Sequence, residues 1–270
     1  MLNLSNIKHI YFLGVGGIGM SALARYFVAK NYEVAGYDRN QSQICLGLEN
    51  ASCEISYSDT IDSIPDSFKT SENVLVVYTP AIPKENKLLM YFQDNSYDLY
   101  KRAEVLGAIT KKSECLAIAG THGKTTISSM LTYVLSDNKI DCSAFLGGIA
   151  TDFNSNLKIG SEDITVVEAD EYDRSFLQLY PNWALVSSLD ADHLDIYGSA
   201  SGLEESFKLF SDKVELRNLI VKEGLGLNAK YTYALNSETA DFSALNIRVE
   251  DMAYHFDIRY PQGFCVNVIT

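Results

Sequence analysis

Residues 8–38 read KHIYFLGVGGIGMSALARYFVAKNYEVAGYD, which is a short apolar strand, a glycine-rich turn, an amphipathic helical stretch and a second strand. Short β-branched or aromatic runs that alternate with amphipathic helices are typical of βαβ units on a parallel sheet. A further strand of this kind is predicted in ENVLVVYTP, residues 72–80, which ends at a proline. The N-terminal part of the chain is therefore predicted to be an α/β domain.

The same rhythm begins again after residue 108. ITKKSE (109–114) is polar and basic and precedes a new strand, ECLAIAG, so we expect one domain over 1–108 and a second over 109–270. Apolar runs that end in acids follow at 163–170 (DITVVEAD) and 183–190 (WALVSSLD). The second region thus also predicts strands that carry polar residues at their ends.

The last third of the chain predicts one helix and then a change of pattern. SASGLEESFKLFSDKV (199–214) is a helical segment with Ser199 as a plausible N-cap and acids in its first turn. After residue 240, ALNIRVED, YHFDIRY and FCVNVIT favour antiparallel strands, with a tight turn at PQG. The chain stops on an apolar strand, which we interpret as a cut in a longer protein.

Composition excludes several classes of function. The 270 residues are 47% hydrophobic and 21% charged, typical of a globular protein with room for two cores. A formal net charge of −13 argues against a protein that binds nucleic acid by neutralising phosphates. Any anionic ligand must therefore be attracted by local groups such as backbone N–H groups, a lysine or a divalent cation.

Cysteine usage and apolar stretches favour a cytoplasmic protein. The cysteines are odd in number and never in a C-x-x-C spacing, so we expect reduced, mostly buried thiols rather than disulfides or a zinc site; they are Cys45, Cys53, Cys115, Cys142 and Cys265. The N-terminus does not have the pattern of a signal peptide. No apolar stretch reaches the roughly 20 residues needed to span a bilayer.

The first glycine loop contains the spacing G-x-G-x-x-G; its glycines are Gly14, Gly16, Gly17 and Gly19. Residues without Cβ let the backbone approach a diphosphate, and the following helix presents free N–H groups. Asp38 closes the next strand, where an acid can bond a ribose hydroxyl. We predict a nucleotide diphosphate site, although the glycines could serve only a tight turn, and the loop does not separate NAD from a UDP-sugar.

The second glycine loop, GTHGKTT at 120–126, lies between the apolar strand Leu116–Ala119 and a helical run. Such a loop wraps backbone N–H groups around phosphates, while Lys124 reaches the β and γ oxygens and the Thr125 hydroxyl coordinates magnesium. Ile118 occupies the first glycine position of the strict pattern G-x-x-x-x-G-K-[ST]. The remaining G-x-x-G-K-T-T still predicts a phosphate site, against the alternative of a chance G-K-T at a helix start.

Acids and one histidine follow at strand ends, where phosphoryl transfer needs metal ligands. Glu168 closes ITVVE and is the predicted metal ligand, whereas its neighbours Asp170, Glu171 and Asp173 are assigned to a solvated acidic loop. His193, in DADHLD (190–195), can complete the shell of a divalent ion. The remaining histidines His9 and His255 are interpreted as structural.

Taken in order, these motifs resemble the Mur ligase family over nearly all 270 residues. The resemblance rests on GVGGIGMS from Gly14, GTHGKTT at 120–126, VEADE at 167–171 and DADHLD at 190–195. Within the family, the first loop, KRAE at 101–104 and SFL after the acidic loop are similar to the member that adds L-alanine. The family's muropeptide-recycling ligase has a different first loop and is the weaker match.

The resemblance implies a Rossmann-like N-terminal domain that binds the UDP moiety of UDP-N-acetylmuramic acid. It implies next a P-loop-type ATPase central domain with a small antiparallel β extension. The implied UDP-sugar residues are Gly14, Gly16, Gly17, Gly19, Met20, Ser21 and Asp38. The implied ATP residues are Gly120, Thr121, His122, Gly123, Lys124, Thr125, Thr126 and Asn156. Thr125 and Glu168 would bind one magnesium ion and His193 a second, with Lys124, Glu168 and His193 as the catalytic set.

The implied reaction is ATP-dependent formation of an amide bond. The muramyl lactate carboxylate attacks the γ-phosphate of ATP, giving an acyl phosphate and ADP, and the alanine amine then displaces phosphate. Two departures from the family pattern stand out: Ser188 replaces a usual asparagine, and the H-N-x-x-N segment and C-terminal domain are not found in these residues. The resemblance therefore predicts a chain that binds substrates but ligates poorly. The alternatives are a non-catalytic nucleotide-binding remnant and an NAD-dependent oxidoreductase built on the first loop.

Overall fold

The computed structural model describes residues 2, 4, 6–190 and 194–269, and the chain divides into two compact units. The first unit contains 1–115, 125–168 and 178–180, and the second contains 116–124, 169–177 and 181–270. Each unit is thus assembled from separate stretches of sequence. The border crosses the second glycine loop, since Lys124 belongs to the second unit and Thr125 to the first.

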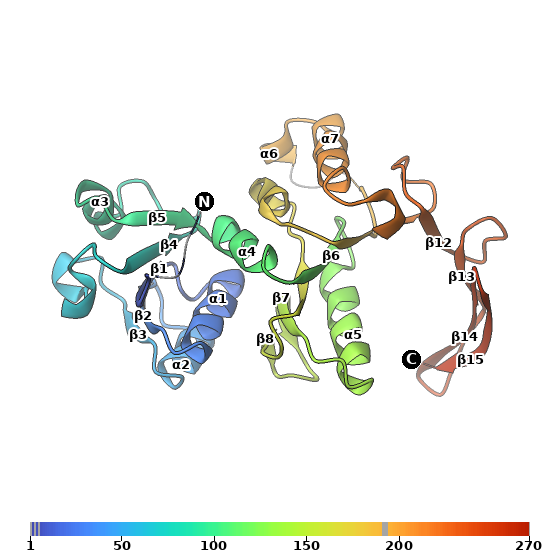
Figure 1. The fold of residues 1–270 in the computed structure, drawn as a ribbon, viewed down its shortest axis with the longest axis horizontal. Helices are drawn as coiled ribbons and strands as arrows, with labels where there is room; N and C mark the ends of the chain where they lie inside the picture. The colour runs from blue at the N-terminus through green and yellow to red at the C-terminus, as the bar shows by residue number, and fades with distance from the viewer. Residues whose placement is uncertain (1, 3, 5, 191–193, 270) are drawn as a thin grey trace. The chain divides into compact units, whose positions relative to one another are not determined.

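A five-stranded parallel sheet forms the N-terminal part of the first unit (Figure 1), in the order β3-β2-β1-β4-β5. The strands are β1 (His9–Leu13), β2 (Glu33–Tyr37), β3 (Glu54–Ser56), β4 (Val74–Tyr78) and β5 (Asp98–Lys101). The strand order reverses beside β1, which pairs with both β2 and β4. Ligands of doubly wound sheets bind at such a switch point, outside the carboxyl ends of the strands. The predicted parallel α/β sheet is confirmed.

Helices and an aromatic cluster complete this part of the core. The helices are α1 (Ile18–Ala29), α2 (Gln43–Glu49), α3 (Lys87–Asp94) and α4 (Arg102–Thr110), with short 3-10 turns at Ile61–Ser63 and Asp66–Phe68. α3 begins where the Asn86 side chain accepts hydrogen bonds from Leu88 N and Leu89 N. The fully buried Tyr11 ring lies 5.0 Å from Phe92 and 5.8 Å from Phe68, centroid to centroid. Burial raises the pKa of the Tyr11 phenol, which is therefore neutral.

The first unit also contains α5 (Lys124–Asp137, with Lys124 itself in the second unit), β7 (Ser143–Ala150), β8 (Ser155–Lys158) and β9 (Ile164–Glu168). β7 pairs antiparallel with β8 and parallel with β9. α1 packs against this group, because the ring of Tyr26 lies 5.4 Å from that of Phe145. The helix that follows the first glycine loop is therefore held by strands encoded more than 100 residues later.

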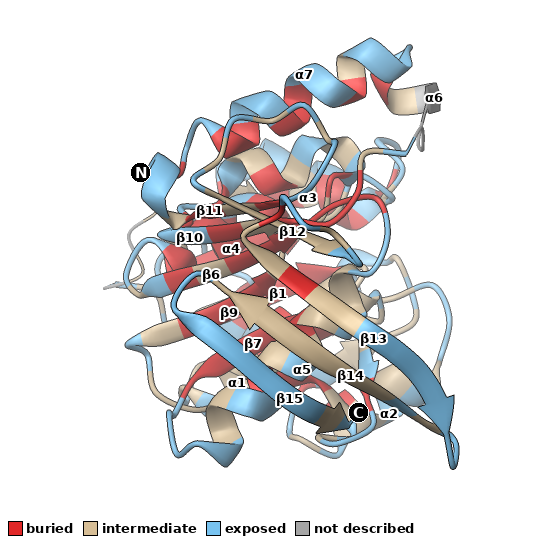
Figure 2. Ribbon diagram, turned by 90° about the vertical axis from the view of Figure 1, so that its right-hand side faces the viewer, coloured by how far each residue is buried: buried red, intermediate tan, exposed pale blue. Residues whose placement is uncertain are grey.

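The second unit is built on strands in the order β6-β10-β11-β12-β13-β14-β15. They are β6 (Glu114–Ala119, in this unit from Leu116), β10 (Trp183–Val186), β11 (Leu219–Lys222), β12 (Tyr231–Leu235), β13 (Phe242–Glu250), β14 (Ala253–Tyr260) and β15 (Gly263–Ile269). The pairs from β6 to β13 are parallel, and the pairs β13–β14 and β14–β15 are antiparallel. The predicted antiparallel extension after residue 240 is confirmed, and Figure 2 shows that β15 and the end of β13 are exposed.

Helices α6 (Leu194–Tyr197) and α7 (Ala200–Ser211) and the 3-10 segments Tyr172–Gln178 and Leu216–Asn218 complete the description. Ser199 caps α7 by accepting a hydrogen bond from Gly202 N, as predicted. The prediction of acids in the first turn of α7 was wrong, because the helix begins at Ala200 and Glu204 and Glu205 lie beyond that turn. No helix among the described residues is long and apolar enough to cross a membrane. All five thiols are free, and only that of Cys265 is exposed.

Candidate functional site

The first glycine loop turns sharply out of β1 into α1. Gly14 has φ +86°, a left-handed conformation that favours glycine, and its N–H donates to Tyr37 O at 2.8 Å. A Cβ at Gly16 would lie 2.7 Å from Cys45 Sγ and 2.9 Å from Asp38 Oδ2. The glycines at these two positions are therefore required by backbone conformation and by close packing, respectively.

Asp38 fastens the loop from the end of β2. Its Oδ2 accepts a hydrogen bond from Gly16 N at 2.8 Å, and its Oδ1 accepts one from Asn40 N at 3.2 Å. The carboxylate thus holds the backbone of the loop in its tight turn. The structure brings Asp38 to the loop, as its spacing indicated, and gives it a bracing contact that the sequence did not reveal.

The N-terminus of α1 presents positive charge. Its N-cap is Gly17, which has no side chain to bond the N–H groups of the first turn. Arg102, the first residue of α4, lies over this turn: a Cβ at Gly19 would be 2.7 Å from Arg102 Nη1 and 3.1 Å from Cζ. Free N–H groups, the helix dipole and a guanidinium group together suit an anion. Arg102 was not predicted as a site residue from the sequence, although it lies in the KRAE motif.

Ser21, Met20 and Asn156 are buried beside this loop. Ser21 Oγ donates to Ile18 O at 2.9 Å. Asn156 Nδ2, from β8, donates to Ile18 O at 2.6 Å and to Ser21 Oγ at 2.9 Å. Asn156, which the resemblance grouped with the ATP residues, therefore lies against the first turn of α1 and braces it.

The second glycine loop is shaped by two left-handed glycines and by the end of β10. Gly120 has φ +129° and Gly123 has φ +81°. A Cβ at Gly120 would lie 2.2 Å from Ser187 Oγ, which donates to Ala119 O at 3.1 Å. The loop can follow this path only because residue 120 has no side chain.

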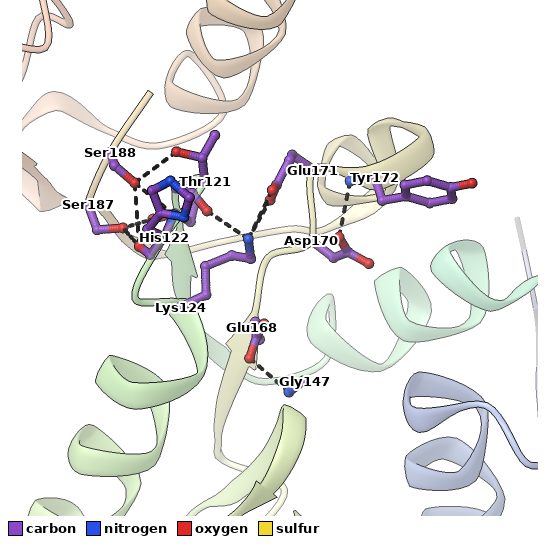
Figure 3. Close-up of polar contacts among 12 residues, drawn as sticks. Thr121, His122, Lys124, Gly147, Glu168, Asp170, Glu171, Tyr172, Ser187 and Ser188 are labelled. Carbon is purple, nitrogen blue, oxygen red and sulfur yellow. Dashed lines mark hydrogen bonds and ion pairs between the residues drawn. The ribbon is translucent and has the colours of Figure 1, made fainter. Parts of the chain in front are cut away.

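Ser188 binds the same loop through its hydroxyl group (Figure 3). Ser188 Oγ accepts a hydrogen bond from His122 N at 2.8 Å and lies 3.0 Å from Thr121 Oγ1. Thr121 Oγ1 in turn accepts a hydrogen bond from Asp190 N at 3.1 Å. The serine that departs from the family pattern thus has a defined role in holding the loop.

Lys124 is held inside this loop by a buried carboxylate. Its Nζ donates to Gly120 O at 2.8 Å and to Glu171 Oε1 at 3.0 Å, and it lies 2.8 Å from Glu171 Oε2 (Figure 3). The Glu171 side chain is 2% exposed and that of Lys124 is 13% exposed. The assignment of Glu171 to a solvated loop is therefore wrong, because the turn after β9 directs its side chain inward.

Thr125 and Glu168 lie in the first unit beside two glycines of β7. Gly147 N donates to Glu168 Oε2 at 2.8 Å, and a Cβ at Gly147 would lie 2.2 Å from Glu168 Oε1. A Cβ at Gly148 would lie 3.3 Å from the methyl group of Thr125. The bare backbone of Gly147 therefore accommodates the Glu168 carboxylate, and the Thr125 side chain lies beside Gly148. A carboxylate and a hydroxyl are both oxygen ligands that suit magnesium.

The other predicted residues of the second loop are solvent-accessible. His122 and Thr126 are exposed, and His122 Nε2 lies 3.6 Å from Asp190 Oδ2. His193 is outside the described residues, so the structure does not test its predicted metal role. Within the described part of the chain, no cluster of three or more histidine, cysteine, aspartate or glutamate residues could hold a metal ion.

Comparison with known proteins gives matches over both halves of the chain. A sequence profile described as Mur ligase family, catalytic domain, matches residues 9–114, and one described as Mur ligase middle domain matches residues 118–268. The UDP-N-acetylmuramate–L-alanine ligase of Christiangramia forsetii is 50% identical over 99% of this chain and 59% of its own length. That of Parabacteroides distasonis is 45% identical over 97% of this chain and 58% of its length. The chain thus spans less than two thirds of these curated relatives.

Solved structures show the same fold. The UDP-N-acetylmuramate–alanine ligase of Thermotoga maritima matches with a TM-score of 0.84 and 23% identity, covering 97% of this chain and 60% of that one. A UDP-N-acetylmuramate:L-alanyl-γ-D-glutamyl-meso-diaminopimelate ligase from Neisseria meningitides matches with a TM-score of 0.82 and 21% identity, covering 96% and 86%. These matches confirm the predicted fold class: a Rossmann-like domain, a P-loop-type domain and a small antiparallel extension.

Proposed function

The chain belongs to the Mur ligase family, and on that premise we propose that it supplies the UDP-sugar and ATP sites of an enzyme that joins L-alanine to UDP-N-acetylmuramic acid. The observation that carries the proposal is 50% identity to a UDP-N-acetylmuramate–L-alanine ligase across 99% of this chain. The geometry agrees, because both glycine loops are suited to phosphates: Arg102 lies beside the first loop, and Lys124 lies within the second. Such a ligation belongs to the synthesis of peptidoglycan precursors.

The first loop would bind the diphosphate of the UDP-sugar. Gly14, Gly16, Gly17 and Gly19 allow close approach of the backbone, and the first turn of α1, which includes Met20 and Ser21, would supply N–H donors. Arg102 would neutralise the diphosphate, which matters in a chain with a net charge of −13. Asp38 would hold the loop and contact the ribose.

The second loop would bind ATP. Its backbone N–H groups at Gly120, Thr121, His122 and Gly123 would surround the phosphates, and Lys124 would contact the β and γ oxygens. Thr126 and the first turn of α5 would complete the cradle. The fit rests on the two left-handed glycines, which give the loop an open curvature without side chains.

Magnesium would be held by Thr125 and Glu168, with His193 as ligand of a second ion. The oxygen donors and the side-chain-free backbone of Gly147 and Gly148 fit this assignment. A bound magnesium ion would supply charge neutralisation between the two anionic reactants. Lys124 would add a fixed positive charge at the phosphoryl group as it transfers.

The proposed chemistry has two steps. The lactate carboxylate of the muramic acid attacks the γ-phosphorus, the bond to the bridging oxygen breaks, and ADP leaves. The alanine amine then attacks the acyl carbon, phosphate leaves with its electron pair, and the amine loses a proton. The chain's residues act by holding two anions in line and by offsetting the charge that develops between them.

The proposal also concerns where the reaction takes place and which residues bind each substrate. We expect the reaction to take place in the cytoplasm, with residues 1–108 binding the UDP-sugar and residues 109–270 binding ATP. Because ligation needs closure that excludes water around ATP and the incoming amine, these 270 residues alone are expected to bind substrates and to ligate poorly. Alanine-dependent release of phosphate by this chain at a rate typical of enzymes would overturn that expectation.

Calorimetric titration with UDP-N-acetylmuramic acid tests the first site, with magnesium present and NADH as the control ligand. We expect saturable binding of the UDP-sugar and none of NADH. Titration with ATP tests the second site, with Lys124→Met as the variant that should bind ATP more weakly, because it lacks the cation expected at the β and γ phosphates. Binding of NADH but not of the UDP-sugar would replace the ligase proposal with an oxidoreductase.

A further inference from the structure

The contact between Lys124 and Glu171 bears on how nucleotide binds. An ammonium group has three donor hydrogens. In this structure Lys124 Nζ donates to Gly120 O at 2.8 Å and to Glu171 Oε1 at 3.0 Å, and Glu171 Oε2 lies 2.8 Å away as the second oxygen of the ion pair. The charge of the Lys124 ammonium group is thus already balanced by Glu171 in the absence of a nucleotide.

The position of Glu171 is fixed by its backbone. Its carbonyl oxygen accepts hydrogen bonds from Arg174 N at 2.9 Å and from the hydroxyl of Tyr197. Asp173 and Arg174, two and three residues after Glu171, both have left-handed φ angles near +50°, an uncommon conformation for residues with side chains. Phe176 then packs 4.9 Å from Phe210, centroid to centroid. Glu171 therefore reaches Lys124 from an anchored turn rather than from a flexible loop.

We propose that Glu171 is a positioning residue that competes with the nucleotide for Lys124 and so weakens the binding of ATP and ADP to the loop. This inference rests on the proposed ATP site. A phosphate that takes the ammonium weakens its ion pair with Glu171. Glu171 is 2% exposed, so water cannot replace the lost contact well, and its negative charge stays beside the arriving phosphates.

The competition for Lys124 would help Glu171 promote the release of ADP after each reaction. A nucleotide held by an uncontested lysine would leave slowly after its γ-phosphate is transferred. A carboxylate that recaptures the ammonium stabilises the emptied loop and favours release of ADP. Glu171 would thus act through Lys124, without contact with any reacting atom.

The test is calorimetric titration of the 270-residue chain and its Glu171→Gln variant with magnesium and ATP, ADP or AMP. The glutamine keeps an oxygen for Lys124 but has no charge. Losing one charge-assisted contact in the empty loop should tighten ATP and ADP binding about tenfold. AMP binding should not change, because Lys124 is expected to reach only the β and γ phosphates.

Two further variants separate positioning from a structural role. In a Lys124→Met background, Glu171→Gln should have no effect on ADP affinity, because the competition needs the ammonium. Asp170→Asn, which removes the same charge one residue earlier from a carboxylate that bonds Tyr172 N, should leave ADP affinity unchanged. If Glu171→Gln does not fold, Glu171→Asp keeps the charge but shortens the reach and should shift affinity in the same direction.

Unchanged or weaker ADP binding by the folded Glu171→Gln variant would overturn the inference, as would an equal change for AMP. These outcomes differ from a failure of the proposed function, in which the unaltered chain would not bind ATP at all.

Discussion

Replacing Asn156 by alanine tests how β8 supports the first glycine loop. The Asn156 side chain is 1% exposed, and its amide group donates two hydrogen bonds, to Ile18 O and Ser21 Oγ. Each such bond contributes about 1 kcal/mol net. Ile18 O keeps its bond from Ser21 Oγ, so the substitution leaves only part of the acceptor capacity unmet. Together with the small space left behind, we expect a loss of about 2–3 kcal/mol in the free energy of unfolding.

Urea denaturation followed by far-UV circular dichroism measures this loss, and titration with UDP-N-acetylmuramic acid measures its effect on the loop. The control is Asn95→Ala, whose amide makes one exposed bond to Tyr91 O at 2.8 Å and should cost less than about 0.5 kcal/mol. We expect Asn156→Ala to weaken UDP-sugar binding, because the first turn of α1 loses its brace. An Asn156→Ala variant that unfolds like the unaltered chain but no longer binds ATP would contradict this bracing role and place Asn156 at the nucleotide instead.

Three other changes follow from the structure. Arg102→Met should weaken UDP-N-acetylmuramic acid binding about tenfold and reduce its salt dependence, because a cation beside the proposed diphosphate site is lost. Titration at two ionic strengths measures both effects, and a variant that binds as tightly as the unaltered chain at each ionic strength would contradict this role. Gly147→Ala should reduce the magnesium dependence of ATP binding by about tenfold, since its Cβ must displace the Glu168 carboxylate, whereas ATP binding without magnesium should persist. Burial, and then Glu162, raise the pKa of Tyr26 from 10.0 to about 12, so the unfolded chain releases this proton first and stability should fall as pH rises from 10 to 12. Tyr26→Phe should flatten that decline in chemical denaturation, and an identical pH profile would show that Tyr26 does not contribute to it.

The sequence predicted the parts of the fold that depend on local pattern. Apolar runs bounded by glycines and acids marked β1, β4, β6 and β9, and the change of rhythm after residue 240 marked the antiparallel strands. The two glycine loops were also recognisable, because each lies between an apolar strand and a helix, and the structure gives Gly14, Gly120 and Gly123 left-handed φ angles. Local conformational preference decides these features, so neighbouring residues are enough to predict them.

The features that the sequence did not reveal depend on distant contacts. Glu171 looked solvated among acids, but an anchored turn directs its side chain to Lys124, 47 residues earlier. Arg102 reaches Gly19 because α4 packs against α1, which begins more than 80 residues earlier in the chain. Ser188 was noticed only as a departure from the family pattern, and its hydrogen bond to the second loop had no signal in the sequence. These contacts depend on the tertiary structure, and the local pattern of a single sequence does not show which distant residues come together.

The assembly of the first unit from separate stretches imposes an order on its synthesis. The five-stranded sheet is complete at Lys101, but the strand that carries Asn156 is made some 55 residues later. At the usual rates of translation this interval lasts on the order of seconds. During that time Tyr26 of α1 lacks Phe145, its later ring partner on β7. The nascent chain therefore passes through a stage in which the first glycine loop has been synthesised but Asn156, which braces the first turn of α1, has not.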